Sequence, residues 1–265
     1  MYKAIFLDLD GTLLDDKKNI SQENLDAIKY AIKKGAYVFI ASGRSIESTQ
    51  KYWTKVSASR YMIYSNGAGI FDCQENENIS ILSIENDVIL KLFNYAIKND
   101  ICVRLDTPYG RYITNMLYSV NGTEMKLTEE IEKFLNENEV VQLSFVHVIE
   151  EKIYDLVEFF KNNINQELKI EDLFKTGLNN EYFAMNVVNT AVSKGNAIEG
   201  LCKFLKIDLK DVIAMGDGLN DISMIERVGL GIAMENAKEE VKKVAKIVTC
   251  TNNESAVAKI IKANF

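Results

Sequence analysis

Short apolar runs separated by amphipathic stretches recur along this chain and predict strands that alternate with helices. Residues 5–9, 37–41 and 211–215 are dominated by apolar side chains, a pattern typical of strands buried on both faces. Helical periodicity at 21–34 begins at Ser21, a favourable N-cap type, and ends at Gly35. A further helix from about residue 45 and a strand at 61–65 continue the alternation, which predicts a parallel sheet flanked by helices.

From about residue 82 the pattern changes to that of a second, α+β unit. There we expect helices at 87–98, 129–136 and 151–162, and strands at 101–105, 111–115, 140–148 and 182–188. The first pattern then resumes, with helices at 195–205, 221–228, 238–245 and 255–262, and strands at 211–215, 229–233 and 247–249. We therefore expect a core made of residues 1–81 and 187–265, and an inserted domain made of residues 82–186.

Two carboxylates stand at the end of the first predicted strand. Asp8 and Asp10 are two residues apart, so they project from the same face of the strand. At about 4 Å and an effective dielectric constant near 20, their repulsion is about 4 kcal/mol. The pair therefore indicates a bound cation, a shared proton or a reaction that needs both acids. The alternative is that they only end the strand and open a turn, since Asp before Gly11 is common turn chemistry.

The pattern of an apolar strand followed by acids is repeated near residue 216, where another apolar run ends in glycine and acids. Asp217 and Asp221 follow that run, Ser42 and Arg44 follow the strand predicted at 37–41, and Lys194 precedes a predicted helix. In open parallel sheets, functional groups collect at the carboxyl ends of the strands. We expect these side chains to form one site.

In order and spacing, these segments resemble the four motifs of the haloacid dehalogenase-like hydrolases, and most closely those of the Cof-type sugar-phosphatase branch. The matching segments are residues 8–12, 42–44, 194 and 216–221, and residues 64–68 and 231–237 are also similar to segments of that branch. The resemblance implies a Rossmann-like α/β core, with the insert as an α+β cap domain. Residues 252–255 depart from the pattern, because relatives often carry an acidic segment ending in glycine there, so we expect a glycine-dependent conformation to be lost.

The resemblance implies a phosphatase that forms an aspartyl-phosphate on Asp8, with Asp10 as general acid and then general base. Its substrate is expected to be a small phosphorylated metabolite such as a sugar phosphate. Mg²⁺ is the expected cofactor, and its ligands would be Asp8, the Asp10 backbone carbonyl, Asp217 and, in support, Asp221. The phosphate would be bound by Ser42, Gly43, Arg44, Lys194 and Asn220.

Simpler interpretations exist for several of these residues. Lys194 could be a surface lysine, Arg44 could form only a surface ion pair, Ser42 could be a cap or turn residue, and Asp221 could cap the helix that follows it. Residues 106–112, around Pro108, indicate an exposed hairpin turn, or a sugar contact if that face meets the site. Alternative activities are phosphoryl transfer to another hydroxyl and, from a different class, a non-catalytic phospho-accepting module.

Composition narrows the choice of partner. The 265-residue chain carries a net charge of −7 and has a pI near 5.0, which opposes broad nucleic-acid binding. The four scattered cysteines form no CxxC pair, which argues against zinc, and a structural role is expected for the single histidine, His147. Because neither a leader nor an apolar run of about 20 residues is evident, we expect a cytoplasmic protein without a membrane partner. We also expect a monomer.

Overall fold

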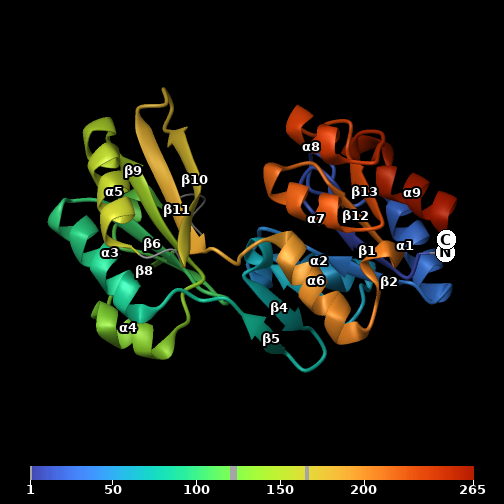
Figure 1. The fold of residues 1–265 in the computed structure, drawn as a ribbon, viewed down its shortest axis with the longest axis horizontal. Helices are drawn as coiled ribbons and strands as arrows, with labels where there is room; N and C mark the ends of the chain where they lie inside the picture. The colour runs from blue at the N-terminus through green and yellow to red at the C-terminus, as the bar shows by residue number, and fades with distance from the viewer. Residues whose placement is uncertain (1, 120–123, 165–166) are drawn as a thin grey trace. The chain divides into compact units, whose positions relative to one another are not determined.

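The computed structural model describes residues 2–119, 124–164 and 167–265 and divides the chain into two units (Figure 1). The core unit comprises Met1–Ile81 and Val192–Phe265, and the inserted unit comprises Leu82–Ala191. The chain returns to the core at residue 192 instead of the expected 187. The reason is that strand β11 (Tyr182–Asn189) stays paired with β10 (Leu168–Thr176) as far as Asn189.

The core unit contains a parallel five-stranded sheet in the order β14-β13-β12-β1-β2. The strands are β1 (Ala4–Leu7), β2 (Tyr37–Ile40), β12 (Val212–Gly216), β13 (Leu230–Ala233) and β14 (Ile247–Val248). All four residues of β1 are buried, since a neighbouring strand lies on each side and helices cover both faces. This explains the unbroken apolar run at the start of the chain and confirms the predicted α/β parallel-sheet core.

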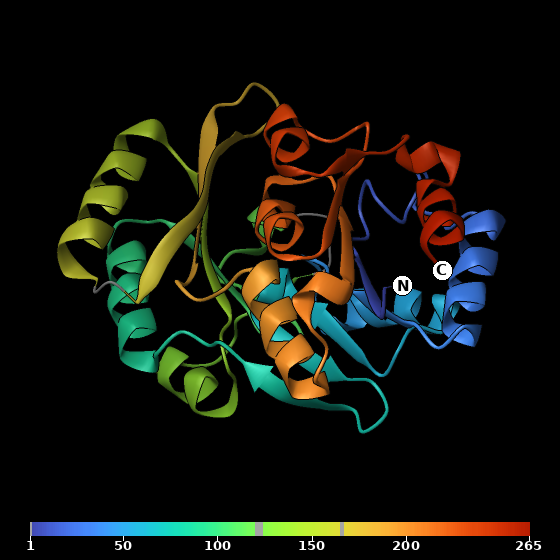
Figure 2. The ribbon, with the colours of Figure 1, turned by 45° about the vertical axis from the view of Figure 1, so that its right-hand side comes forward.

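Helices flank this sheet in two groups (Figure 2). The helices are α1 (Gln22–Lys33), α2 (Ile46–Val56), α6 (Lys194–Leu205), α7 (Ile222–Arg227), α8 (Glu239–Val244) and α9 (Ala256–Asn264). Helix α1 packs against α9, and α6 packs against α7. The hydroxyl of Ser21 accepts a hydrogen bond from the Asn24 N–H at 3.2 Å, which confirms the predicted N-cap of α1.

Residues 61–65 were expected in the parallel sheet, but this prediction was wrong. Strand β3 (Tyr61–Tyr64) instead forms an antiparallel sheet with β4 (Gly69–Asp72) and β5 (Glu77–Ile81). Its parallel contact is a single bridge between Ala41 and Ile63. Strand β3 pairs with the buried strand β4 instead of the parallel sheet, because a tight turn at residues 65–67 brings β3 and β4 together.

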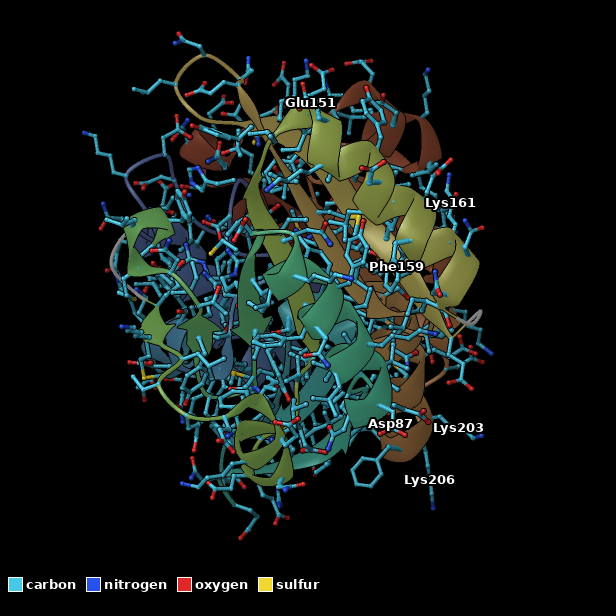
Figure 3. The ribbon with its side chains drawn as sticks, turned by 90° about the vertical axis from the view of Figure 1, so that its left-hand side faces the viewer. Asp87, Glu151, Phe159, Lys161, Lys203 and Lys206 are labelled. Carbon is cyan, nitrogen blue, oxygen red and sulfur yellow. The ribbon has the colours of Figure 1, made fainter. Side chains whose placement is uncertain are left out.

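The inserted unit has a six-stranded sheet in the order β10-β11-β9-β6-β7-β8. The remaining strands are β6 (Cys102–Asp106), β7 (Arg111–Ile113), β8 (Met125–Lys126) and β9 (Gln142–Val148), and the helices are α3 (Asn86–Lys98), α4 (Ile131–Glu137) and α5 (Glu150–Asn163). Side chains of all three helices share a core with alternate residues of β6 and β9, such as Leu105 and Phe145. Phe159 of α5, which Figure 3 labels, stacks on Tyr95 of α3, with ring centroids 3.9 Å apart. His147 stacks on Tyr118, with centroids 4.6 Å apart.

Two turns test particular expectations. The chain at 106–112 is a hairpin in which the Thr107 N–H donates to the Gly110 carbonyl at 2.8 Å, as the predicted turn requires. The turn is exposed only at Tyr109 (62%), whereas Asp106, Thr107 and Pro108 are buried. The expected loss of a glycine conformation at 252–255 was wrong. Ser255 adopts a left-handed φ of 55°, and its hydroxyl lies 2.9 Å from that of Ser21, so a serine occupies the conformation that favours glycine.

Short 3₁₀ helices complete the secondary structure: Ser65–Gly67, Met116–Tyr118, Leu209–Asp211, Leu219–Asp221 and Asn252–Glu254. None of the helices in the described parts of the chain has both the length and the apolar run needed to cross a bilayer.

Two glycines give a matched test of core packing. A Cβ at Gly231 of β13 would overlap the Ile225 carbonyl oxygen, whereas nothing lies within 4 Å of a Cβ at Gly200 of α6. We expect Gly231→Ala to lower the free energy of unfolding by about 1–3 kcal/mol. Gly200→Ala should raise it by about 0.5–1 kcal/mol, because alanine favours a helix interior. Urea unfolding measures both, and equal effects would contradict this description of the packing.

Candidate active site

Two acids meet at one edge of the core sheet because their strands are parallel neighbours. Asp8 directly follows β1 and Asp217 directly follows β12, and the Asp8 N–H donates to the Met215 carbonyl at 3.1 Å. Asp221, one short turn further along, completes a cluster in which one carboxylate oxygen of each acid lies within 4.8 Å of the others. The structure therefore brings together three of the four predicted acids.

Lys194 neutralises part of this cluster. Its Nζ lies 2.5 Å from Asp8 Oδ1 and 2.6 Å from Asp221 Oδ1, and its side chain is fully buried. It is the first residue of α6, where the Ser193 hydroxyl caps the helix. The surface-lysine interpretation was therefore wrong. Desolvation lowers the pKa of Lys194, but Asp221 and Asp8 outweigh that effect and keep the amine charged.

Asp221 organises the loop that carries Asp217. Its Oδ2 accepts hydrogen bonds from the N–H groups of Asp217 and Gly218, both at 2.9 Å, while Oδ1 accepts from Lys194. Asp221 stands at the N-cap position of helix α7 but its side chain makes no capping hydrogen bond there, so it does more than cap that helix. Both carboxylate oxygens have donors, which suits a supporting role better than direct metal ligation.

The cluster carries more negative than positive charge. Asp8, Asp217 and Asp221 supply three carboxylates against the single ammonium of Lys194. Burial raises the pKa of Asp217 to about 6, although a hydrogen bond from Thr12 opposes that shift. Burial likewise raises the pKa of Asp8 against the effect of Lys194, and Asp221 adds to the rise. A divalent cation would balance the charge.

The donor atoms fit a hard cation. Within the described parts of the chain, Thr12 bonds Oδ1 of Asp217 and Lys194 bonds Oδ1 of Asp8, which leaves Oδ2 of each acid open to a further contact. Among the described residues, no hydrogen bond reaches the Asp10 carbonyl oxygen. Carboxylate and carbonyl oxygens are the ligands that Mg²⁺ and Ca²⁺ take in proteins.

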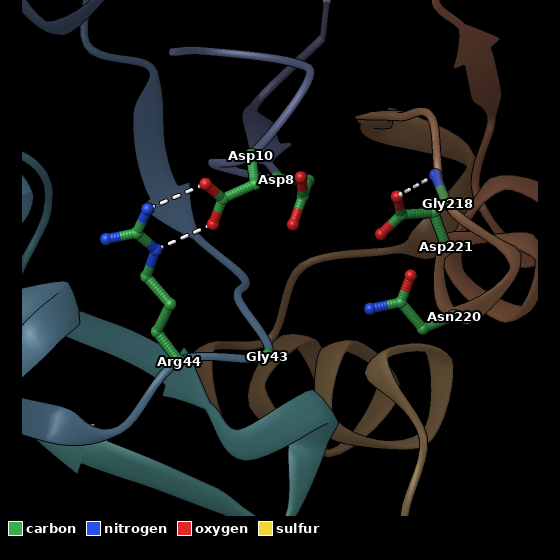
Figure 4. A pocket seen from close by; sticks show the side chains of 7 residues that line it. All are labelled: Asp8, Asp10, Gly43, Arg44, Gly218, Asn220 and Asp221. Carbon is green, nitrogen blue, oxygen red and sulfur yellow. Dashed lines mark hydrogen bonds and ion pairs between the residues drawn. The ribbon is translucent and has the colours of Figure 1, made fainter. Parts of the chain in front are cut away.

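Asp10 is held by two cations, Arg44 and Lys18. Arg44 donates hydrogen bonds from Nε to Asp10 Oδ2 and from Nη2 to Asp10 Oδ1, both at 2.6 Å (Figure 4). Lys18 Nζ lies 2.7 Å from Asp10 Oδ1. The Arg44 hydrogen bonds lower the pKa of Asp10 to about 2. The ion-pair interpretation of Arg44 therefore describes this structure, with Asp10 as the partner. Sequence reasoning missed Lys18, whose spacing from Asp10 matches no motif.

A cavity of about 190 Å³ opens beside these groups (Figure 4). Its lining residues are Asp8, Asp10, Gly43, Arg44, Gly218, Asn220 and Asp221. Ser42 and Lys194 lie behind this lining: Ser42 is 1% exposed, and its hydroxyl accepts a hydrogen bond from the Arg44 N–H at 3.2 Å, as a turn residue would. The volume suits a phosphate-sized group better than a whole drug-sized ligand.

Sequence reasoning also missed Asn66, whose Oδ1 accepts a hydrogen bond from Asn220 Nδ2 at 2.7 Å.

Comparisons with known proteins place this site in context. The family model for haloacid dehalogenase-like hydrolases matches residues 5–261. The 5-amino-6-(5-phospho-D-ribitylamino)uracil phosphatase YcsE of Bacillus subtilis is 30% identical over 260 residues, which cover 98% of this chain and 94% of that protein. The structure of a haloacid dehalogenase-like hydrolase from Bacteroides thetaiotaomicron matches with a TM-score of 0.84 and 26% identity over 100% of both chains. The subclass IIB sugar phosphatase BT4131 matches with a TM-score of 0.75 and 25% identity over 98% of both chains.

The buried lysine provides a test of the charge balance. Lys194→Met leaves Asp8 and Asp221 without their shared cation, so we expect the free energy of unfolding at neutral pH to fall by about 3–5 kcal/mol. Lys203→Met, at an exposed position of the same helix (Figure 3), is the matched control and should change it by less than about 0.5 kcal/mol. Urea unfolding measures the free energy of unfolding of both variants. Similar decreases in the two would contradict the role of Lys194 in neutralising the buried acids.

Proposed function

Because this chain belongs to the haloacid dehalogenase-like hydrolases, we propose that it is a Mg²⁺-dependent phosphatase that forms an aspartyl-phosphate on Asp8. The family and its relatives named as phosphatases make the chain an enzyme of that class. The observation that supports the proposed mechanism best is the fully buried Lys194, which holds Asp8 at the edge of a cavity. A lysine is buried so completely only when its charge is matched.

Asp8 is the nucleophile in this proposal. Lys194 occupies Oδ1, which leaves Oδ2 to attack phosphorus while the bond to the leaving oxygen breaks. Asp10, once released from its cations and protonated from the solvent, gives that proton to the leaving oxygen. In the second step Asp10 takes a proton from water, the water oxygen bonds to phosphorus, and the bond to Oδ2 breaks, releasing phosphate and restoring Asp8.

The first step requires Asp10 to leave its ion pair. Arg44 holds both oxygens of Asp10, and a carboxylate so held is a poor proton donor. An incoming phosphate ester competes for the same guanidinium, because Arg binds phosphate in the bidentate way that it binds a carboxylate. In this scheme Arg44 exchanges Asp10 for the phosphate, which gives Arg44 its proposed binding role and frees Asp10 to act.

The other phosphate ligands follow from the lining of the cavity. Gly43 and Asn220 border the cavity and would donate from a backbone N–H and a side-chain amide. Ser42 lies behind Gly43 and would bind phosphate only after releasing the Arg44 N–H. Lys194 would oppose the negative charge that develops during transfer.

Mg²⁺ would be held by the Asp8 carboxylate, the Asp10 carbonyl and Asp217, with Asp221 supporting the loop. When bound, the ion would screen the phosphate charge from the carboxylates and polarise a phosphate oxygen.

The proposed substrates are small phosphorylated sugars or sugar-derived chains. YcsE is named for a phosphorylated ribityl compound, and BT4131 is named a sugar phosphatase. The small cavity, whose lining includes Arg44 and Asn220, fits the phosphate end that such compounds share.

Phosphate release from a panel of substrates tests the activity. Sugar phosphates, ribityl phosphates such as flavin mononucleotide, nucleotide monophosphates and pyridoxal phosphate are offered to the wild-type protein and to Asp8→Asn. We expect the fastest release from a sugar phosphate, and a loss of at least about 10³-fold in Asp8→Asn with an unchanged fold, because an amide is a poor nucleophile. Asp26→Asn, an exposed change in α1, is the control. Undiminished turnover in Asp8→Asn would overturn the mechanism, and labelled phosphoryl appearing in a new ester would indicate transfer.

Metal removal tests the charge argument separately. We expect an excess of EDTA to stop phosphate release and added Mg²⁺ to restore it, because the acid cluster repels a phosphate dianion without a cation. Mg²⁺ should also raise the melting temperature of the wild-type protein but not that of Asp217→Asn, since an ion bound only by the folded state stabilises it. Full activity in EDTA would contradict the proposal.

A further inference from the structure

The turn at Ser65–Gly67, which the proposed mechanism does not use, has an unusual backbone. Ser65, Asn66 and Gly67 have φ values of 45°, 57° and 95°, so three consecutive residues are left-handed. Residues other than glycine normally enter this region singly, and each one is strained there. The neighbours of the turn must therefore stabilise it, and those neighbours are the proposed phosphate-binding segments.

The backbone of the turn is bonded to the loop after β2. The Ser65 N–H donates to the Arg44 carbonyl at 2.9 Å, and the Asn66 N–H donates to the Ser42 carbonyl at 3.0 Å. Both ends of the Ser42–Arg44 loop are thus fixed by consecutive residues of one turn. This loop supplies Gly43 to the cavity.

The same turn packs against the residue before Lys194. A Cβ at Gly67 would overlap the carbonyl oxygen of Ser193, so only glycine allows this close approach. One three-residue turn therefore touches the segments that carry Arg44 and Lys194.

The side chain of Asn66 reaches a third segment. Its Oδ1 accepts a hydrogen bond from Asn220 Nδ2 at 2.7 Å, and a Cβ at Gly43 would come within 2.7 Å of the same oxygen. The Asn66 amide oxygen therefore lies between Gly43 and Asn220, which both line the cavity. Figure 4 shows the amide nitrogen of Asn220 directed towards Gly43.

We propose that Asn66 is a positioning residue of the phosphate site, which fixes the amide of Asn220 in the orientation that presents an N–H to a phosphate oxygen. An amide NH₂ has two donors. Asn66 Oδ1 takes one of them, which prevents the amide from turning its oxygen towards the phosphate and leaves the second N–H for the ligand. This inference rests on the proposed function, because it assumes that phosphate binds beside Asn220.

Asn66→Gly tests the role, because glycine keeps the left-handed backbone and removes only the side chain. We expect KM for a phosphate ester and the inhibition constant of inorganic phosphate both to rise about five- to tenfold, the effect of one hydrogen bond. The turnover number kcat should change less than about twofold, and the melting temperature should stay within about 2 °C of the wild-type value. Asn76→Gly is the matched control, since Asn76 is an exposed left-handed asparagine (φ 58°) in a turn of the same unit.

A double-variant cycle separates positioning from general loosening of the loop. If Asn66 acts through Asn220, Asn66→Gly should have little further effect on KM in an Asn220→Ala background, so the two changes are not additive. Full additivity, or an unchanged KM and phosphate inhibition constant in Asn66→Gly, would overturn the proposal.

The failure of this inference is distinguishable from failure of the proposed function. If wild-type protein releases no phosphate from any ester, the function fails, and calorimetric titration with inorganic phosphate then tests the positioning alone. Five- to tenfold weaker phosphate binding by Asn66→Gly would still support it, while equal binding, or no binding by the wild-type protein, would refute it.

Discussion

The contact between the Lys194 ammonium and the carboxylates of Asp8 and Asp221 is the interaction on which the site depends. Its three members come from the start of the chain, the beginning of α6 and the turn before α7. Removing two carboxylates from water is unfavourable unless a cation accompanies them, so the lysine makes this arrangement of strand ends possible. The loop with Asp217 depends on it in turn, because Asp221 uses its other oxygen to hold that loop.

The surroundings of Asp8 and of Asp10 differ in their balance of charge. The acids around Asp8 share one ammonium, whereas Asp10 by itself pairs with both Arg44 and Lys18. Two acids only two residues apart are therefore held in opposite conditions: the pKa of Asp8 is raised by burial, and that of Asp10 is lowered by its hydrogen bonds. This order is the reverse of what a carboxylate nucleophile paired with a proton donor requires, so the proposed mechanism depends on a cation beside Asp8 and on the transfer of Arg44 from Asp10 to the phosphate.

Much of the core could be predicted because its signals are local. The buried run at β1 and the Ser21 cap follow from periodicity and capping chemistry, and Lys194, Asp217 and Asp221 stood at strand and helix ends where parallel sheets gather functional groups. Strand β3 was assigned to the wrong sheet because strand partners are chosen by tertiary contacts, which the alternation of elements does not contain.

The partners of the site residues were harder to predict than the residues themselves. The pairing of Asp10 with Arg44, and of Asn220 with Asn66, depends on loop geometry across large sequence separations, and the pairing of Asp10 with Lys18 depends on the conformation of the loop between them. The left-handed Ser255 was missed for the same reason, since a hydrogen-bonded contact with Ser21 offsets the absence of glycine.

The strand order has a consequence for how the protein is made. Strand β1, an interior strand of the core sheet, takes one partner, β2, from the start of the chain and the other, β12, from near its end. The insert, Leu82–Ala191, is continuous in sequence and leaves the ribosome before β12 is synthesised. We therefore expect the insert to fold during translation, before β1 has its second strand partner. Until β12 is synthesised, one edge of β1 is unpaired, so the nascent chain depends on protection from aggregation.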